Sequence, residues 1–166
     1  RADACRAQQR VYGEAQLLLK VKEPVAAEFP LLRRDHVLFS FLHLAAEPVL
    51  ARTLRDIGLT AIAFETVQVA GRLPLLAPMS DIAGRIALQV GAHLLHRPQG
   101  GRGLLLGGMP AAPRGRVVVL GAGEAGGNAA SLAAALGAEV MVFDRTREAM
   151  ARMFALGPNV TALTAY

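Results

Sequence analysis

Two lysines lie two residues apart near the start of this sequence, and their type and spacing could do chemistry. All of the 18 basic side chains except Lys20 and Lys22 are arginine. The apolar stretch from Gln16 to Val21 predicts a β-strand, in which residues two apart point to the same face. A lysine presents a compact ammonium whose pKa burial can lower, so it can hold a small carboxylate or pass a proton. We therefore expect at least one of the two to be functional, the alternative being two solvated lysines on an edge strand.

A histidine lies near the end of the next apolar run. Residues His36 to Leu44 predict a second strand, which ends close to His43. Ligands usually bind at the carboxyl ends of the strands in a parallel sheet, and an imidazole suits proton transfer near neutral pH. His43 is thus a candidate proton donor and acceptor, with a core histidine bonded to a backbone carbonyl as the alternative. The remaining histidines lack metal-ligand spacing, so we expect no metal.

Three glycines in the stretch VVVLGAGEAGGNAA have the spacing of a dinucleotide-binding turn. Gly121, Gly123 and Gly126 follow an apolar strand and open an alanine-rich helix, the context that gives the GxGxxG pattern a mechanism. The first glycine permits a tight turn, the second leaves room for a pyrophosphate, and the third lets helix and strand pack closely. Free N–H groups at the helix start would face the phosphates. The alternative is a glycine turn that binds no nucleotide.

An aspartate ends the next predicted strand, 18 residues after Gly126. The carboxylate of Asp144 could accept hydrogen bonds from both hydroxyls of an adenine ribose and would repel a 2′-phosphate, which favours NAD over NADP. Arg145 and Arg147 weaken this inference, because an arginine beside the site can accommodate the phosphate. We expect NAD as the cofactor, with Arg145 as a further cofactor-binding candidate.

Strand and helix patterns alternate along the chain and predict an α/β fold with parallel strands. We expect a partial Rossmann-type sheet, its first half, together with part of a second α/β catalytic domain. The expected parts are a partial substrate domain (1–76), a connecting helix (77–96) with Ser80 as its N-cap, and the first half of an NAD-binding domain (97–166). The predicted strands are 16–21, 36–44, 59–67, 116–121, 139–144 and 159–166, and the predicted helices are 2–11, 46–58, 78–95, 123–137 and 145–157.

The composition of the 166 residues suits a buried core, with 53% hydrophobic and 19% charged residues. The net charge of +5 does not indicate nucleic-acid binding, because the arginines are scattered and aromatic residues are few. No apolar run approaches the roughly 20 residues of a membrane helix. A single cysteine and the absence of a visible secretory signal suit the cytoplasm. The chain starts inside a predicted helix and stops inside a predicted strand, so both ends are expected to be truncated.

Six segments in unbroken order carry a resemblance to the bacterial alanine dehydrogenase family. They are LLLKVKEP, LFSFLHLAAE, AIAFETVQ, LPLLAPMSDIAGRIALQVGAHLL, QGGRGLLLGG and VVVLGAGEAGGNAA. The resemblance implies an NAD-dependent enzyme that interconverts L-alanine with pyruvate and ammonia. It also implies a homo-oligomer, commonly a hexamer.

The resemblance implies a role for individual residues. Lys22 matches the family lysine that holds the substrate carboxylate and carbonyl, and His43 matches the histidine that donates and accepts the proton. Lys20 would have a supporting role at most. The remaining matches all lie at the cofactor. Ser80 matches a serine near it, and Glu124 and Ala125 match loop positions that contact it through their backbone. Asp144 matches the acid that binds the ribose.

The sequence also departs from the family pattern. Family members carry an N-terminal strand with a substrate-binding arginine, and a second half of the nucleotide-binding domain with a return segment that completes the catalytic domain. These parts have no counterpart in the sequence. Two other hypotheses therefore stay open: a nucleotide-binding or assembly fragment without catalysis, and a transhydrogenase-type subunit that exchanges hydride with a second nucleotide.

Overall fold

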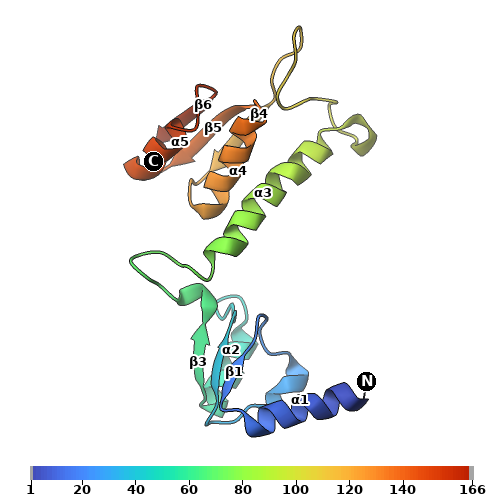
Figure 1. Ribbon diagram of the computed structural model, residues 1–166, viewed down its shortest axis with the longest axis vertical. Coiled ribbons are helices and arrows are strands. Elements are labelled where there is room, and N and C mark those ends of the chain that lie inside the picture. The colour runs from blue at the N-terminus through green and yellow to red at the C-terminus, as the bar shows by residue number, and fades with distance from the viewer. Residues whose placement is uncertain (1, 165–166) are drawn as a thin grey trace. The chain divides into compact units, whose positions relative to one another are not determined.

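The computed structural model describes residues 2–164, with side chains from residue 6 onward. The chain divides into two compact units, the first up to Leu76 and the second from Ala77. Each unit contains a three-stranded parallel sheet. Helices lie beside the sheet in each unit (Figure 1). The expected α/β fold with parallel strands is confirmed.

The sheet of the first unit has the strand order β1-β2-β3. Leu19 of β1 pairs with Phe39 of β2, which pairs in turn with Ile62 of β3, so the carboxyl ends of the three strands lie at one edge. The elements of this unit are α1 (Ala2–Glu14), β1 (Leu17–Leu19), the 3-10 helix η1 (Ala26–Leu31), β2 (Val37–Ser40), α2 (Pro48–Ile57), β3 (Thr60–Ala63) and the 3-10 helix η2 (Phe64–Thr66).

Leucines of the sheet and of α2, together with Tyr12 of α1, build the core of the first unit. Leu38 of β2 and Leu42 after it are fully buried, and Leu50 and Leu54 of α2 lie one helical turn apart on the buried face of that helix. The apolar face of α2 thus packs against the sheet. The core cluster consists of Tyr12, Leu18, Leu32, Leu38, Leu42, Leu50 and Leu54.

Strand β1 is shorter than the predicted strand 16–21, and both lysines follow it. The ladder with β2 continues through the backbone, because Lys20 N–H donates to Phe39 O at 3.0 Å and Phe41 N–H donates to Val21 O at 3.3 Å. The chain bends at Val21 and Lys22. The premise that both lysines lie within a strand and share its face is therefore wrong.

The second unit has the strand order β4-β5-β6, again parallel. Val119 of β4 pairs with Val142 of β5, which pairs with Ala162 of β6. The elements are α3 (Ala77–Leu94), the 3-10 helix η3 (Arg97–Gln99), β4 (Arg116–Leu120), α4 (Glu124–Ala135), β5 (Glu139–Asp144), α5 (Arg147–Phe154) and β6 (Val160–Thr164). The last two residues of the predicted strand 159–166 lie outside the described part.

Helix α3 packs against α4 within this unit, and a glycine permits the close approach. A Cβ on Gly84 would overlap the backbone oxygen of Ala125, in the first turn of α4. The expectation that Ser80 caps α3 is wrong, because the helix already begins at Ala77 and Ser80 lies inside its first turn. Pro78 explains the early start, since its fixed φ suits the first helical turn. Within residues 2–164, no helix has the length and apolar character that spanning a bilayer requires.

Candidate functional site

The three predicted glycines form a turn between β4 and α4. Gly121 has a φ of 91°, which glycine adopts without the strain of a side chain. A Cβ on Gly126 would overlap the carbonyl oxygen of Gly121, so only glycine lets the helix start so close to the strand. The space beside Gly123 is open, with no heavy atom within 4 Å of where a Cβ would stand. The turn thus has the geometry that a pyrophosphate needs.

Asp144 lies at the end of β5, directly beside this turn. Its Oδ2 accepts a hydrogen bond from Ala122 N–H at 2.7 Å, and its Oδ1 accepts from the N–H of Thr146 at 2.8 Å and from its hydroxyl at 2.9 Å. These hydrogen bonds, led by the one from Ala122, lower the pKa of Asp144 from 3.8 to about 2. The carboxylate is therefore ionised and holds the glycine turn to the adjacent strand.

The hydrogen bonds of Asp144 limit what else it can bind. An ionised carboxylate offers about four acceptor positions, and Ala122 and Thr146 use three of them. One position, on Oδ2, is left for a ribose hydroxyl while those bonds persist. The expectation that Asp144 binds both ribose hydroxyls stays a prediction, and the second bond would require the Thr146 hydroxyl to turn away.

A hollow of about 510 Å³ opens between the glycine turn and α5. Arg145 lines it, whereas Arg147 is not among the lining residues, and the role of Arg145 in cofactor binding stays a prediction. Arg152 also lines the hollow, and sequence reasoning missed it. The spacing along the helix could have indicated it, because Arg152 lies three residues after Ala149 and therefore on the same helix face, and Ala149 lines the same hollow.

The remaining predicted cofactor residues lie around the start of α4. Glu124 and Ala125 form its first turn and are exposed. Ser80 precedes Gly84 by four residues on α3, and therefore lies on the helix face that packs against Ala125. A hydrogen bond of 2.8 Å from Asn128 Nδ2 to Asp81 Oδ1 ties the two helices together at this end. The second unit thus brings Ser80 to the same end of α4 as the glycine turn.

The candidate catalytic residues belong to the first unit, at the carboxyl edge of its sheet. Lys22 follows β1 and His43 follows β2, and both side chains are exposed. The Ser40 hydroxyl donates to the Lys22 carbonyl at 2.9 Å, which fastens the lysine loop to the end of β2. Because β1 and β2 are adjacent and parallel, the ammonium and the imidazole start from the same edge.

The backbone of His43 adopts a conformation that is uncommon for a residue with a side chain. Its φ is 48°, in the left-handed region that costs free energy and often marks a functional position. The imidazole stacks on Phe41, with ring centroids 6.0 Å apart and planes 10° from parallel. Both its backbone and its ring are therefore held.

Glu65, just after β3, supplies the bond that fixes His43, and sequence reasoning missed it. Its carboxylate accepts from His43 N–H at 2.6 Å and from Leu42 N–H at 3.3 Å. Burial alone would raise the pKa of Glu65, but the backbone hydrogen bonds, including those from His43 and Leu42, lower it overall. Glu65 and His43 line one hollow of about 330 Å³. The rule that ligand sites lie at strand ends, applied to the third strand, could have indicated it.

The core histidine of this unit is His36, whereas His43, for which that role was the alternative, is exposed. His36 is 1% exposed. Its Nδ1 accepts from Arg33 N–H at 3.1 Å, so its Nε2 carries the proton and donates to Tyr12 O at 3.1 Å. Both ring nitrogens of His36 are satisfied structurally, which leaves no proton-transfer role for it.

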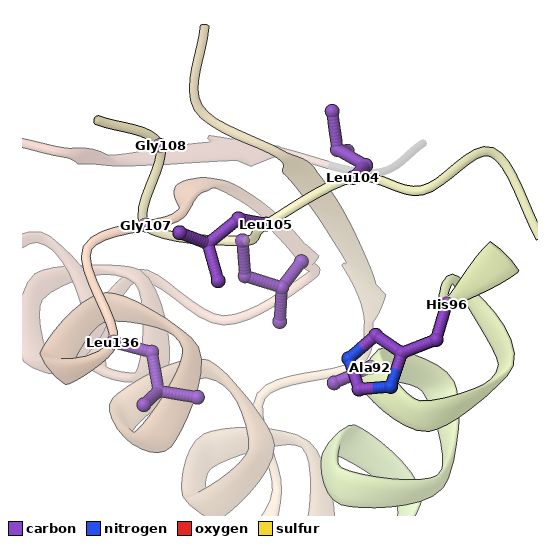
Figure 2. A pocket seen from close by; sticks show the side chains of 8 residues that line it. Ala92, His96, Leu104, Leu105, Gly107, Gly108 and Leu136 are labelled. Atoms are coloured by element: carbon purple, nitrogen blue, oxygen red, sulfur yellow. The ribbon is translucent and has the colours of Figure 1, made fainter. Parts of the chain in front are cut away.

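A third hollow, of about 390 Å³, lies at the far end of α4 from the glycine turn (Figure 2). His96 is the one polar side chain among its lining residues. The others are Ala92 of α3, Leu104, Leu105, Leu106, Gly107, Gly108 and Leu136. One imidazole among apolar groups offers no catalytic or metal-binding arrangement. Among residues 2–164, no three side chains of His, Cys, Asp or Glu gather in a way that could hold a metal ion.

The parallel sheet, the glycine turn and the acidic residue after the second strand define an α/β protein with a Rossmann-type nucleotide-binding unit. The chain belongs to the alanine dehydrogenase/PNT family: residues 2–83 match its N-terminal domain and residues 87–165 its C-terminal domain. The family resemblance found in the sequence is confirmed. Membership implies a nicotinamide-nucleotide cofactor.

Individual relatives agree with this assignment. Alanine dehydrogenase of Mycobacterium tuberculosis is 58% identical over 136 residues, which are 81% of this chain and 37% of that protein. The solved structure of an L-alanine dehydrogenase is 46% identical, with a TM-score of 0.83, over 95% of this chain and 44% of that one. A transhydrogenase structure from Sinorhizobium meliloti is 26% identical, with a TM-score of 0.74, over 93% of this chain and 46% of that one. The chain thus spans less than half the length of these relatives.

Proposed function

We propose that this chain is the part of an NAD-dependent alanine dehydrogenase that carries the substrate lysine, the proton-transfer histidine and the phosphate-binding turn. The reaction is the reversible conversion of L-alanine, NAD⁺ and water into pyruvate, ammonium, NADH and a proton. The observation that carries the proposal is the position of Lys22 and His43 at one edge of a parallel sheet. The high identity to named alanine dehydrogenases supports it.

Lys22 and His43 would act on different parts of the substrate. The exposed ammonium of Lys22 neutralises the alanine carboxylate and polarises the carbonyl that develops at Cα. The imidazole of His43 takes up and returns a proton as water adds to the imine formed from alanine and ammonia then leaves to give pyruvate. Glu65 keeps His43 in place by holding its backbone N–H.

The glycine turn would hold the nicotinamide nucleotide, which accepts the hydride from alanine Cα when bound. Gly121 and Gly126 set the turn, Gly123 leaves the open space for the pyrophosphate, and Glu124 and Ala125 present backbone N–H groups. Ionised Asp144 would meet the ribose and repel a 2′-phosphate, which favours NAD. Arg145 and Arg152 in the same hollow are the residues that would moderate this preference.

The family supports further proposals about the complete protein. We infer a homo-oligomer, with a hexamer as the expected form, and a cytoplasmic location. Size measurement on the full-length protein in solution tests the first, and a monomer would refute it.

A second candidate function is that of a transhydrogenase-type subunit, which the similarity to the Sinorhizobium meliloti structure favours. Such a subunit would exchange hydride between two nucleotides and ignore alanine. One pair of assays on the full-length protein separates the two: NADH formation that depends on alanine supports the dehydrogenase, whereas hydride exchange without response to alanine supports the transhydrogenase. NADH binding by these 166 residues without turnover would support the third hypothesis, a non-catalytic fragment.

A further inference from the structure

One buried carboxylate in the first unit collects hydrogen bonds from three segments of the chain. Glu28, on η1, is only 7% exposed. The Tyr12 hydroxyl and the Gln8 amide of α1 each donate to its Oε1 at 2.9 Å. Val25 N–H donates to its Oε2 at 2.8 Å, and the ammonium of Lys20 contacts both oxygens. The site described above uses none of these groups.

Two of these donors bracket the loop that carries Lys22. Lys20 lies just before the loop and Val25 just after it, so one carboxylate fastens both ends of residues 21–24. From the other side, Phe41 N–H and the Ser40 hydroxyl bond the carbonyls of Val21 and Lys22. The Lys22 backbone is therefore fixed from two directions, while its side chain extends into solvent.

The charges show why a cation precedes the loop. Burial alone would raise the pKa of Glu28, but the hydrogen bonds from Lys20, Val25 and Tyr12 and the charge of Lys20 lower it overall. Glu28 is thus an anion with an exposed fraction of 9% for its side chain, against 23% for that of Lys20. The ammonium of Lys20 contacts both oxygens of this carboxylate, whereas a guanidinium is larger and planar and would change the position of the pair.

We propose that Lys20 and Glu28 form a positioning pair that sets where the ammonium of Lys22 meets the substrate carboxylate. This inference rests on the proposed function, because it assigns the pair an effect on the substrate through Lys22. The pair itself does not touch the substrate. A clamp of this kind matters for catalysis because a misplacement of about 1 Å can cost roughly 10²-fold in rate.

The test uses Lys20→Met in the full-length enzyme. It keeps the apolar stem and leaves Glu28 with its three other donors, so the unit is expected to fold. The KM for pyruvate should rise about tenfold, while the Kd for NADH stays close to wild type. Thermal unfolding should stay cooperative, with a lower midpoint because Glu28 loses its cation. Lys20→Arg keeps the charge and should raise the KM for pyruvate by a smaller factor. If Lys20→Met does not fold, the KM of Lys20→Arg is the test, and a KM equal to that of wild type would contradict the proposal. Glu14→Gln, which removes the exposed ion pair with Arg10, is the matched control and should leave the KM unchanged.

A double-mutant cycle with Lys22→Ala shows whether the pair acts through Lys22. If it does, adding Lys20→Met to Lys22→Ala should change the KM by less than about twofold. A normal KM in folded Lys20→Met, or full multiplication of the two effects in the double variant, would overturn the proposal. A normal KM in Lys22→Ala alone would instead refute the assignment of Lys22, and with it the proposed function.

Discussion

His43 is the residue whose backbone departs most clearly from ordinary geometry at the site. A left-handed conformation in a residue with a side chain costs on the order of 1–3 kcal/mol and persists only where surrounding contacts enforce it. Glu65 supplies that contact through the 2.6 Å bond to His43 N–H, from a position 22 residues further along the chain. The imidazole is therefore placed by a carboxylate that bonds the backbone of the same residue.

Removal of this carboxylate should affect turnover more than nucleotide binding. We expect Glu65→Ala in the full-length enzyme to lower kcat by roughly 10²-fold, because the histidine loses its positioning bond. Glu65→Gln keeps an oxygen acceptor and should recover much of that loss, with the Kd for NADH unchanged in both variants. Steady-state kinetics beside NADH titration measure both quantities. Equal kcat in Glu65→Ala and wild type would contradict the role given to Glu65.

At the scale of elements, the glycine turn depends on how closely α4 approaches β4. A Cβ at Gly126 would overlap the oxygen of Gly121, whereas a Cβ at Gly127 would meet only Met153 Cε at 3.6 Å and Ala122 O at 3.8 Å. These neighbouring glycines of one helix therefore differ in what a methyl group would do. Gly126 serves packing, and Gly127 occupies a helical position that alanine would suit.

Alanine substitution at the two positions should separate these roles. Gly126→Ala should cost about 1–3 kcal/mol of stability and weaken NADH binding, because the turn must open. Gly127→Ala should preserve stability or raise it by about 0.5–1 kcal/mol, as alanine in place of glycine does inside a helix. Denaturant unfolding and NADH titration check both. Equal losses in the two variants would show that the overlap with Gly121 does not decide the outcome.

The link between β5 and the same turn should depend on pH. The pKa of Asp144 is lowered from 3.8 to about 2 in the folded protein. Its stabilising contribution is therefore fully present above about pH 4 and is lost as the pH falls towards 2. The difference in unfolding midpoint between wild type and Asp144→Asn should be largest at neutral pH and shrink across this window. A difference that stays constant down to pH 2 would contradict the assigned bonds.

At the scale of the whole molecule, the features that could be predicted from the sequence are those that depend on the spacing of residues close together in the chain. The turn at Gly121 and the carboxylate of Asp144 followed from a short motif and one strand, and both lie where the spacing put them. The parallel pairing followed from alternating strands and helices. An N-cap at Ser80 would start the helix at Asp81, four residues after the observed start of α3 at Ala77, since Pro78 suits the first turn better than Ser80 suits a cap.

What the sequence could not predict depends on contacts between distant segments. Glu65 reaches His43 across 22 residues, and Glu28 joins α1 to the loop after β1. No short motif marks either carboxylate, because each is defined by the folded positions of its donors. For the two lysines, the sequence therefore supported only a substrate role for Lys22, whereas the buried partner of Lys20 could be identified only from the structure.

Alanine-dependent NADH formation by the full-length protein, measured in wild type, Lys22→Ala and His43→Ala, tests the central claim most directly. The account predicts that each substitution lowers turnover by about 10²–10⁴-fold, while NADH still binds at the glycine turn with an almost unchanged Kd. Undiminished alanine oxidation in either variant would contradict it.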